Sequence, residues 1–171
     1  MEKLIATLSK FNKGFCKVCK AVAGVCTAVF TLITFAQVIG RNFLKIPMIW
    51  SIDICTLMFT WCVFLGCIMG VYYHSHYRIE LLPDRMKKTN AVCDVFADCI
   101  CFAFYAWMVQ YGIKYTEIGM RGIMESTRWP KGYMYVVVPI AGAAMFWMNI
   151  QIFLEDLWKL IGLLKQPKTA E

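Results

Sequence analysis

The sequence has little charge and only two histidines, and its charged residues gather in short blocks. Charged residues make up 17% of the 171 residues, against about 25% in an ordinary soluble domain, while 60% are hydrophobic. Residues 21–40, 54–73 and 132–154 contain no charged side chain at all. Uncharged runs of this length exclude an ordinary soluble domain and indicate an integral membrane protein.

Four segments are long enough to cross a bilayer as helices. A transmembrane helix needs about 20 mostly apolar residues to cross about 30 Å of hydrocarbon. The third segment carries Asp94 and Asp98 in its first turns, where we expect the membrane interface, the helix dipole and nearby cations to stabilise them. We predict a single all-α membrane domain over residues 1–171. Its four transmembrane helices are expected at about 21–40, 50–73, 91–113 and 132–157.

Cationic residues are distributed unevenly between the two sets of connecting segments. Twelve of the 18 lysines and arginines lie before the first span, between the second and third spans, or after the fourth. The positive-inside rule therefore predicts that both termini are cytoplasmic. The net charge of +7 is explained by this topology, and nothing beyond bulk charge favours a nucleic-acid partner.

Residues 1–20 have the pattern of an amphipathic helix. Phe11 and Phe15 belong to an apolar side, and Lys10, Lys13 and Lys17 gather on the opposite side. This pattern predicts a helix lying in the cytoplasmic interface, with its lysines toward the anionic headgroups of membrane lipids. A frayed basic tail is the alternative.

The sequence lacks a P-loop, a glycine-rich nucleotide fingerprint, a nucleophile motif and an internal repeat. Its two histidines, His74 and His76, are two residues apart at the end of one span and do not share a helix face, which argues against haem ligation. A zinc site that combines them with Cys16 and Cys19 is weakly supported, because His-x-His is not the usual partner of Cys-x-x-Cys. We expect no metal and no cofactor.

Nine cysteines raise the possibility of a thiol redox protein. Cys16 and Cys19 have the spacing of a thioredoxin-like motif. Such an enzyme needs reactive cysteines on the oxidising side, yet neither predicted outward loop contains one. Within a span a thiol behaves as a small, inert apolar group. For these reasons we keep a four-helix membrane thiol or quinone redox protein only as the alternative function.

Asp53 lies near the outward end of the second span, where an acid usually has a partner. Arg41 or Lys45 across the short hairpin could supply one. The alternative is an acid in the first helical turn, stabilised by the helix dipole. We expect no acid to be buried deeply within a span, which argues against a self-sufficient small transporter and points to an accessory subunit.

Two blocks of residues have a distinctive order and spacing. The first block contains Arg41-Asn42, Trp50, Asp53, Trp61, Gly66 and His76. The second is Trp129-Pro130-Lys131-Gly132-Tyr133, followed by Pro139 at the start of the fourth span. Together they resemble the small membrane subunit of tripartite ATP-independent periplasmic (TRAP) transporters, the DctQ-like family, over roughly residues 15–160. The family more often has an acidic pair or a glutamate where this chain has Ser51-Ile52-Asp53.

The resemblance implies a non-enzymatic subunit of the bacterial inner membrane that forms a heterodimer with a large membrane subunit. The large subunit carries substrate and sodium, and a periplasmic binding protein delivers an organic acid, such as sialic acid or a dicarboxylate. The small subunit is then a scaffold that does not bind substrate. In the outward loop 114–131, Arg121, Glu125 and Arg128 are the candidates for docking the soluble partner, and a solvated loop without a partner is the alternative.

Glycines within the predicted spans offer places where helices could approach closely. They are Gly66, Gly70, Gly112 and Gly142.

Overall fold

A computed structural model describes residues 2–73 and 87–165 of the chain. All regular secondary structure in these residues is helical. The elements are α1 (Glu2–Ile39), the π-helical turn η1 (Gly40–Leu44), α2 (Trp50–Tyr72), α3 (Lys87–Arg121), the single turn α4 (Gly132–Tyr135) and α5 (Val137–Lys165). Four helical segments are long and apolar enough to span a membrane: Thr7–Leu44, Trp50–Tyr72, Thr89–Arg121 and Gly132–Gly162. The predicted all-α class with four such helices is confirmed.

The helix α1 continues without a break across the boundary that we predicted at residue 20. Its buried face is a seam of small and polar side chains at helical spacing, Asn12, Cys16, Cys19, Ala23 and Cys26. Lys10, Lys13 and Lys17 are exposed on the rest of the helix. Phe11 and Phe15 also lie outside this seam, at 60% and 37% exposure.

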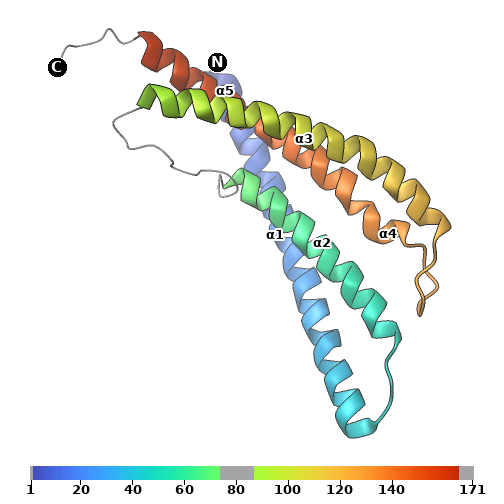
Figure 1. Cartoon of the computed structure of the whole chain (residues 1–171). Helices are drawn as coiled ribbons and strands as arrows, with labels where there is room; N and C mark the ends of the chain where they lie inside the picture. The colour runs from blue at the N-terminus through green and yellow to red at the C-terminus, as the bar shows by residue number, and fades with distance from the viewer. Residues whose placement is uncertain (1, 74–86, 166–171) are drawn as a thin grey trace.

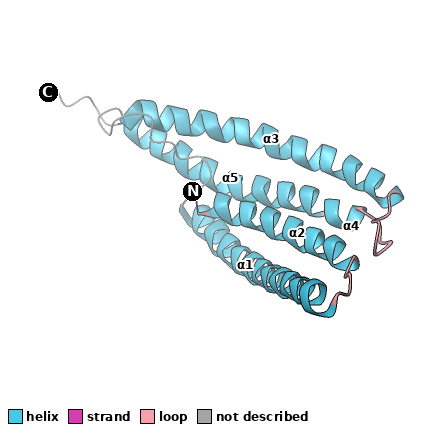
Figure 2. Ribbon diagram, turned by 60° about the horizontal axis from the view of Figure 1, so that its bottom comes forward, coloured by secondary structure: helices cyan, strands magenta, loops and turns pink. Residues whose placement is uncertain are grey.

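The helices form two antiparallel hairpins. One consists of α1 and α2, and the other of α3 with α4 and α5, as Figures 1 and 2 show. The hairpins lie close together at the end where α1 begins and α5 ends, and they splay apart toward the loops that connect α1 to α2 and α3 to α4. The start of α1 and the end of α5 lie at the same end of the molecule, as four crossings require.

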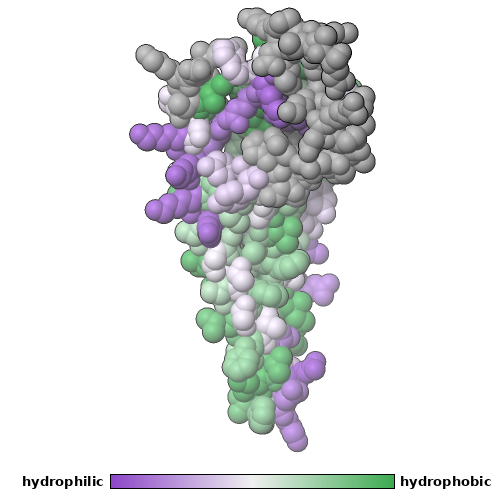
Figure 3. All heavy atoms as spheres, turned by 90° about the vertical axis from the view of Figure 1, so that its left-hand side faces the viewer, coloured by the Kyte–Doolittle hydropathy of each residue, from purple (hydrophilic) through white to green (hydrophobic). Residues whose placement is uncertain are grey.

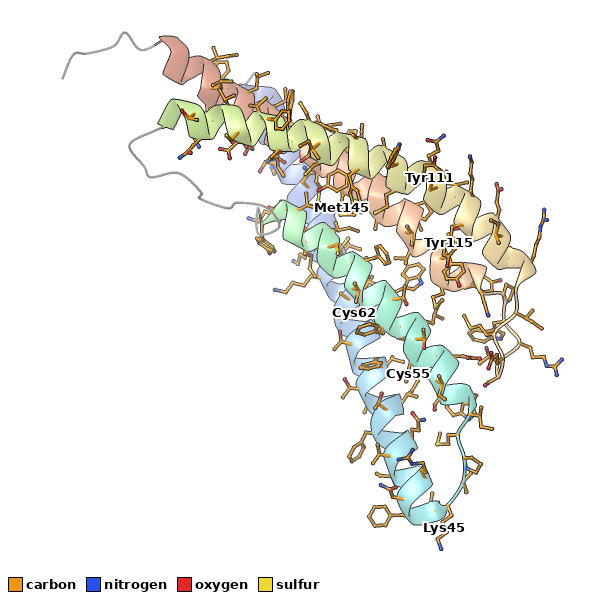
Figure 4. The ribbon with its side chains drawn as sticks, viewed as in Figure 1. Lys45, Cys55, Cys62, Tyr111, Tyr115 and Met145 are labelled. Carbon is orange, nitrogen blue, oxygen red and sulfur yellow. The ribbon has the colours of Figure 1, made fainter. Side chains whose placement is uncertain are left out.

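The core lies where the two hairpins meet. Ile68 and Val71 of α2 pack with Met145 and Met148 of α5, and Figure 4 shows Met145 at this junction. The small Cys16, Cys19 and Ala23 of α1 belong to the same cluster. Small side chains let α1 approach the other helices closely, which is how helices associate in lipid.

Glycines bring α3 against α4 and α5. A Cβ atom added at Gly112 would lie 3.0 Å from the backbone nitrogen of Pro139, and one at Gly142 would lie 3.2 Å from the nitrogen of Val109. At Gly66 an added Cβ would meet nothing within 4 Å. The expectation of close helix approach is therefore confirmed for Gly112 and Gly142. No other described part of this chain comes near Gly66, where approach by a helix of another chain stays a prediction.

The long middle of the surface is apolar. Figure 3 shows apolar residues along the body of the molecule, with hydrophilic residues toward its two ends. Phe96, Phe104 and Trp107 of α3 are each more than half exposed, as are Val25 and Leu32 of α1. Such an extended exposed apolar surface suits lipid or another membrane chain rather than water.

Candidate functional site

The loop between α3 and α4 is folded into a compact hairpin. The backbone N–H of Met124 donates to the carbonyl of Trp129 at 2.8 Å, and that of Lys131 donates to the carbonyl of Gly122 at 2.9 Å. Ile123 and Pro130 form an isolated antiparallel bridge. Arg128 adopts a left-handed backbone conformation with a φ of 59°, which closes the turn. The predicted outward loop thus has a defined shape.

Asp53 holds this loop from the first turn of α2. One carboxylate oxygen, Oδ2, accepts hydrogen bonds from the backbone N–H groups of Ser126 at 3.0 Å and Thr127 at 2.8 Å. It also accepts the hydroxyl of Thr127 at 3.1 Å. Because the N-terminal end of a helix favours negative charge, the position suits an ionised carboxylate. We call Asp53, Ser126 and Thr127 the Asp53 clamp.

The clamp decides between the two alternatives for Asp53. The acid lies in the first turn of α2, as one alternative predicted, and its described hydrogen bonds come from the loop after α3 and not from Arg41 or Lys45, so the other alternative is wrong. Arg41 lies in η1 and Lys45 directly follows it, and both are exposed. The first turn of α2 instead faces the second hairpin. The signal for the clamp was Ser126-Thr127, a pair of turn-forming residues that our sequence analysis did not use.

Trp61 forms the second link between the hairpins. Its indole N–H donates to the carbonyl of Tyr133 at 3.0 Å, which joins the middle of α2 to α4. Trp129 and Pro130 lie beside this contact and line the same groove as Trp61. The structure therefore brings together four residues of the two sequence blocks, Trp61 from the first and Trp129, Pro130 and Tyr133 from the second.

Other residues of the two blocks lie apart from this contact. Trp50 is the first residue of α2 and is 44% exposed. Pro139 lies in the first turn of α5, where a helix tolerates proline, and it packs against Gly112. His76 lies outside the described residues.

The predicted docking residues are presented by the loop and its flank. Arg121 ends α3, and Glu125 and Arg128 lie in the loop, with all three side chains exposed. Glu125 also lines a small cavity of about 220 Å³ together with Asp53 and Lys131.

At the opposite end of the bundle, polar side chains connect α1 with α5. The side-chain amide of Asn12 donates to Gln151 at 2.7 Å, and the amide of Gln151 donates to Glu155 at 2.7 Å. Asn12 is only 1% exposed. Our sequence analysis missed this series of hydrogen bonds, although Asn12 shares the helical spacing of the cysteine seam.

The expectation that no acid is buried deeply within a span is wrong. Asp98 is completely buried inside the helix bundle, and Asp156 is only 7% exposed. The side-chain amide of Asn149 donates to the backbone carbonyl of Asp98 at 3.2 Å, which joins α3 to α5 at this point. Periodicity located Asp98 on a helix but did not show that this face packs against α5.

The cysteines are all free. Cys16 and Cys19 are 3% and 4% exposed and belong to the core cluster. Cys62 and Cys55 face threonines of α1, with Cys62 Sγ 3.1 Å from the hydroxyl of Thr27 (Figure 4). Among residues 2–73 and 87–165, no group of three or more His, Cys, Asp or Glu side chains is placed to hold a metal ion.

The fold and the interhelical contacts define a multi-pass membrane protein whose two hairpins are joined at a structured loop. A family model described as "Tripartite ATP-independent periplasmic transporters, DctQ component" matches residues 30–159. The chain belongs to this family, which confirms the resemblance seen in the sequence. The family is one of transport components.

Two curated relatives are similar to this chain. The C4-dicarboxylate TRAP transporter small permease protein DctQ of Vibrio cholerae is 35% identical over 77 residues, which is 43% of this chain and 33% of the relative. The sialic acid TRAP transporter permease protein SiaT of Haemophilus influenzae is 23% identical over 131 residues, which is 72% of this chain and 20% of the relative. The matches thus span a third and a fifth of the lengths of these relatives.

Proposed function

We propose that this chain is the small scaffold subunit of a sodium-coupled, binding-protein-dependent TRAP transporter in the bacterial inner membrane. It pairs with a large membrane subunit and does not bind the transported solute itself. The solute is an organic acid, such as a dicarboxylate or sialic acid, in keeping with the printed names of the two relatives. The match of the family model to residues 30–159 carries the proposal, because it includes the end of α1, all of α2 and α3, the clamped loop and most of α5.

Two further observations support pairing with a larger membrane chain. In SiaT, a segment similar to this chain makes up a fifth of one longer permease polypeptide, which favours a lasting association when the parts are separate chains. Gly66, a residue of the first sequence block, faces open space on α2 and leaves room for a neighbouring helix. The sequence argued against a self-sufficient transporter because no acid was expected to be buried. Asp98 is buried, so that argument no longer holds, and the accessory role rests on the family match.

The proposed topology places both termini in the cytoplasm. The exposed lysines Lys10, Lys13 and Lys17 then lie at the cytoplasmic interface, where anionic lipid headgroups attract them. The clamped loop and the turn at Lys45 lie on the periplasmic side. A topology reporter, an enzyme that is active on only one side of the membrane, is fused after residue 171 to test this arrangement. A signal showing that the reporter is in the periplasm would contradict it.

Purification from native membranes tests the pairing. We expect the tagged chain, extracted in mild detergent, to bring down a much larger multi-span protein in a fixed ratio, identified by mass spectrometry. Gly66→Leu is expected to reduce the recovery of that protein without unfolding this chain. Gly14→Leu, at another glycine with nothing within 4 Å, is the matched control. Recovery of the chain alone or as a homo-oligomer would overturn the proposal and make bound quinone and thiol reactivity the next tests.

The clamped loop is the proposed docking surface for the soluble binding protein. Its charged residues Arg121, Glu125 and Arg128 are exposed, and their mixed charge would set orientation and association rate more than final affinity. We expect Arg121→Glu with Arg128→Glu to slow uptake when the binding protein is scarce, and excess binding protein to restore it. Lys45→Glu, on the other loop at this end, is the control. Unchanged uptake by the double variant at low binding-protein concentration would refute the docking role.

A further inference from the structure

The second half of α3 carries a row of polar side chains that the described helices leave exposed. Gln110, Lys114 and Glu117 are separated by four and three residues, so they lie along one side of the helix. We call these three residues the polar stripe. The row continues toward the start of α3 through small side chains that are also exposed, Cys99, Ala103 and Ala106.

Another side of α3 is suited to lipid. Phe96, Phe104 and Trp107 are each more than half exposed. At about 100° per residue, Phe104 lies about 120° around the helix from Gln110. The helix therefore presents apolar rings in one direction and the polar stripe in another.

The turn between α1 and α2 marks the outer boundary of the membrane. Arg41 and Lys45 are exposed there, together with Phe43, Ile49 and Trp50. Cations, a tryptophan and apolar side chains close together suit the headgroup region. If the end of α3 lay at the headgroups instead, this turn would extend into water with Phe43 81% exposed.

Contacts between the hairpins place the polar stripe deep below this boundary. Trp61 lies eleven residues after Trp50, about 16 Å along α2, and donates its hydrogen bond to the carbonyl of Tyr133 in α4. Gly119 of α3 packs against α4, because a Cβ added there would lie 3.1 Å from the backbone nitrogen of Gly132. The polar stripe precedes Gly119 and lies deeper still, near the middle of a hydrocarbon core about 30 Å thick.

The side chain of Lys114 points toward the middle of the membrane. Its Nζ lies 5.5 Å from the ring centroid of Tyr111, which is one turn nearer the start of α3 (Figure 4). Among residues 2–73 and 87–165, no carboxylate lies within ion-pair distance of this ammonium. An ionisable group at this depth faces protein or a water-filled cavity, because lipid tails offer it no partner.

We infer that the polar stripe binds a transmembrane helix of the large membrane subunit. The complementary helix presents an acidic side chain to Lys114 and a hydrogen-bond donor or a cation to Glu117. The small side chains further along the row let the two backbones approach closely. This inference rests on the proposed function, which supplies the large subunit.

A second copy of this chain fits the polar stripe less well. Two copies inserted in the same orientation and related by a two-fold axis would meet at equal depth. Lys114 would then lie beside Lys114, and Glu117 beside Glu117. Such like-charge contacts are unfavourable, so the stripe favours a chain with a different sequence.

Site-specific photocrosslinking in native membranes tests the contact. Benzoylphenylalanine replaces Gln110 in one variant and Phe104, on the side suited to lipid, in the control. After irradiation we expect the Gln110 variant to be joined to the much larger chain and the Phe104 variant to carry mainly lipid, as mass spectrometry would show. A crosslink of this chain to itself at Gln110, lipid adducts alone there, or equal crosslinking to the large chain from both positions would overturn the inference.

Reversal of one charge tests the chemistry of the contact. Lys114→Glu is expected to lower the recovery of the large subunit at least about tenfold, because it places an acid against an acid. Lys45→Glu, at an exposed lysine of the turn after α1, is the control and should leave recovery unchanged. Both variants should keep the Tm of the separated chain, because both lysines are exposed in it.

The two proposals fail in different ways. Full recovery of the large subunit with Lys114→Glu would overturn this inference and leave the proposed pairing intact. If the unmodified chain brought down no large subunit, the proposed function would fall and this inference with it. Where Lys114→Glu fails to fold, the crosslinks from Gln110 still decide the question.

Discussion

At the scale of the residue, Asp53 connects two parts of the chain that are more than 70 residues apart in sequence. One carboxylate oxygen accepts three hydrogen bonds from Ser126 and Thr127. Hydrogen bonds to an ionised acceptor contribute about 1.5–3 kcal/mol, more than bonds between neutral groups. The charge of Asp53 therefore adds to the backbone hydrogen bonds that fold the loop 122–131.

The first prediction concerns this charge. Asp53→Asn keeps the size of the side chain but replaces the ionised acceptor with a neutral amide. We expect backbone amide exchange at Ser126 and Thr127 to become about 5–30 times faster, which corresponds to a loss of 1–2 kcal/mol. Hydrogen exchange followed by mass spectrometry measures the rate of exchange in the peptides that contain Ser126 and Thr127.

Glu117→Gln is the control, because Glu117 is an exposed acid on α3 near the same end of the molecule. Equal protection of the loop in Asp53→Asn and in the unmodified chain would show that the hairpin forms without the clamp.

At the scale of the element, the pairing of α3 with α5 depends on positions without a side chain. Gly112 faces the backbone nitrogen and the ring of Pro139, and both lie 3.0 Å from where its Cβ would be. The pyrrolidine ring is rigid and α5 begins only two residues earlier, so neither group can move aside freely. Gly142 performs the same function opposite Val109.

The second prediction compares two glycines within helices. Gly112→Ala is expected to destabilise the chain by about 1–3 kcal/mol, because the added methyl group overpacks the contact with Pro139. At about 2–4 °C per kcal/mol for a chain of this size, its Tm in detergent falls measurably. Gly24→Ala is the control and should leave the Tm equal or slightly higher, since nothing lies within 4 Å and alanine favours helix. A Tm for Gly112→Ala as high as that of Gly24→Ala would contradict the close approach.

At the scale of the whole molecule, the two hairpins are joined mainly at one end. Ile68, Val71 and Met148 are almost completely buried there, while the splayed end is connected through the Asp53 clamp and the Trp61 hydrogen bond. Lipid tails are as apolar as these side chains, so the junction is held by close packing rather than by exclusion of water. The two hairpins are thus packed together at one end and diverge toward the other (Figure 1).

The third prediction tests where the packing lies. Met148→Ala leaves a cavity at the junction and is expected to cost about 1–3 kcal/mol, at the lower end of the usual range because lipid solvates apolar groups well. Phe104→Ala removes a larger side chain that is 59% exposed and should cost less than about 1 kcal/mol. Thermal unfolding in one detergent measures both. A larger loss for Phe104→Ala would place the main packing surface of α3 on its outer side.

Much of the architecture follows from local properties of the sequence. Three uncharged runs and a fourth apolar run with two acids in its first turns predicted four membrane-spanning helices, and the structure has four helical segments long and apolar enough to span. The reason is that a backbone in lipid must satisfy its own hydrogen bonds, so length and apolarity are sufficient signals. The spacing of the two residue blocks also led to the DctQ component family, which the family model confirms over residues 30–159.

The tertiary structure decided which faces meet. Whether Asp53 pairs with Arg41 or with the loop depends on the angle between two hairpins, and whether Asp98 meets headgroups or Asn149 depends on the rotation of α3. In a membrane helix nearly every side chain is apolar, so periodicity does not distinguish a face toward lipid from a face toward protein. The four helices and the family were therefore determined by the sequence itself. The Asp53 clamp, the buried acids and the groove between the hairpins arise only from packing.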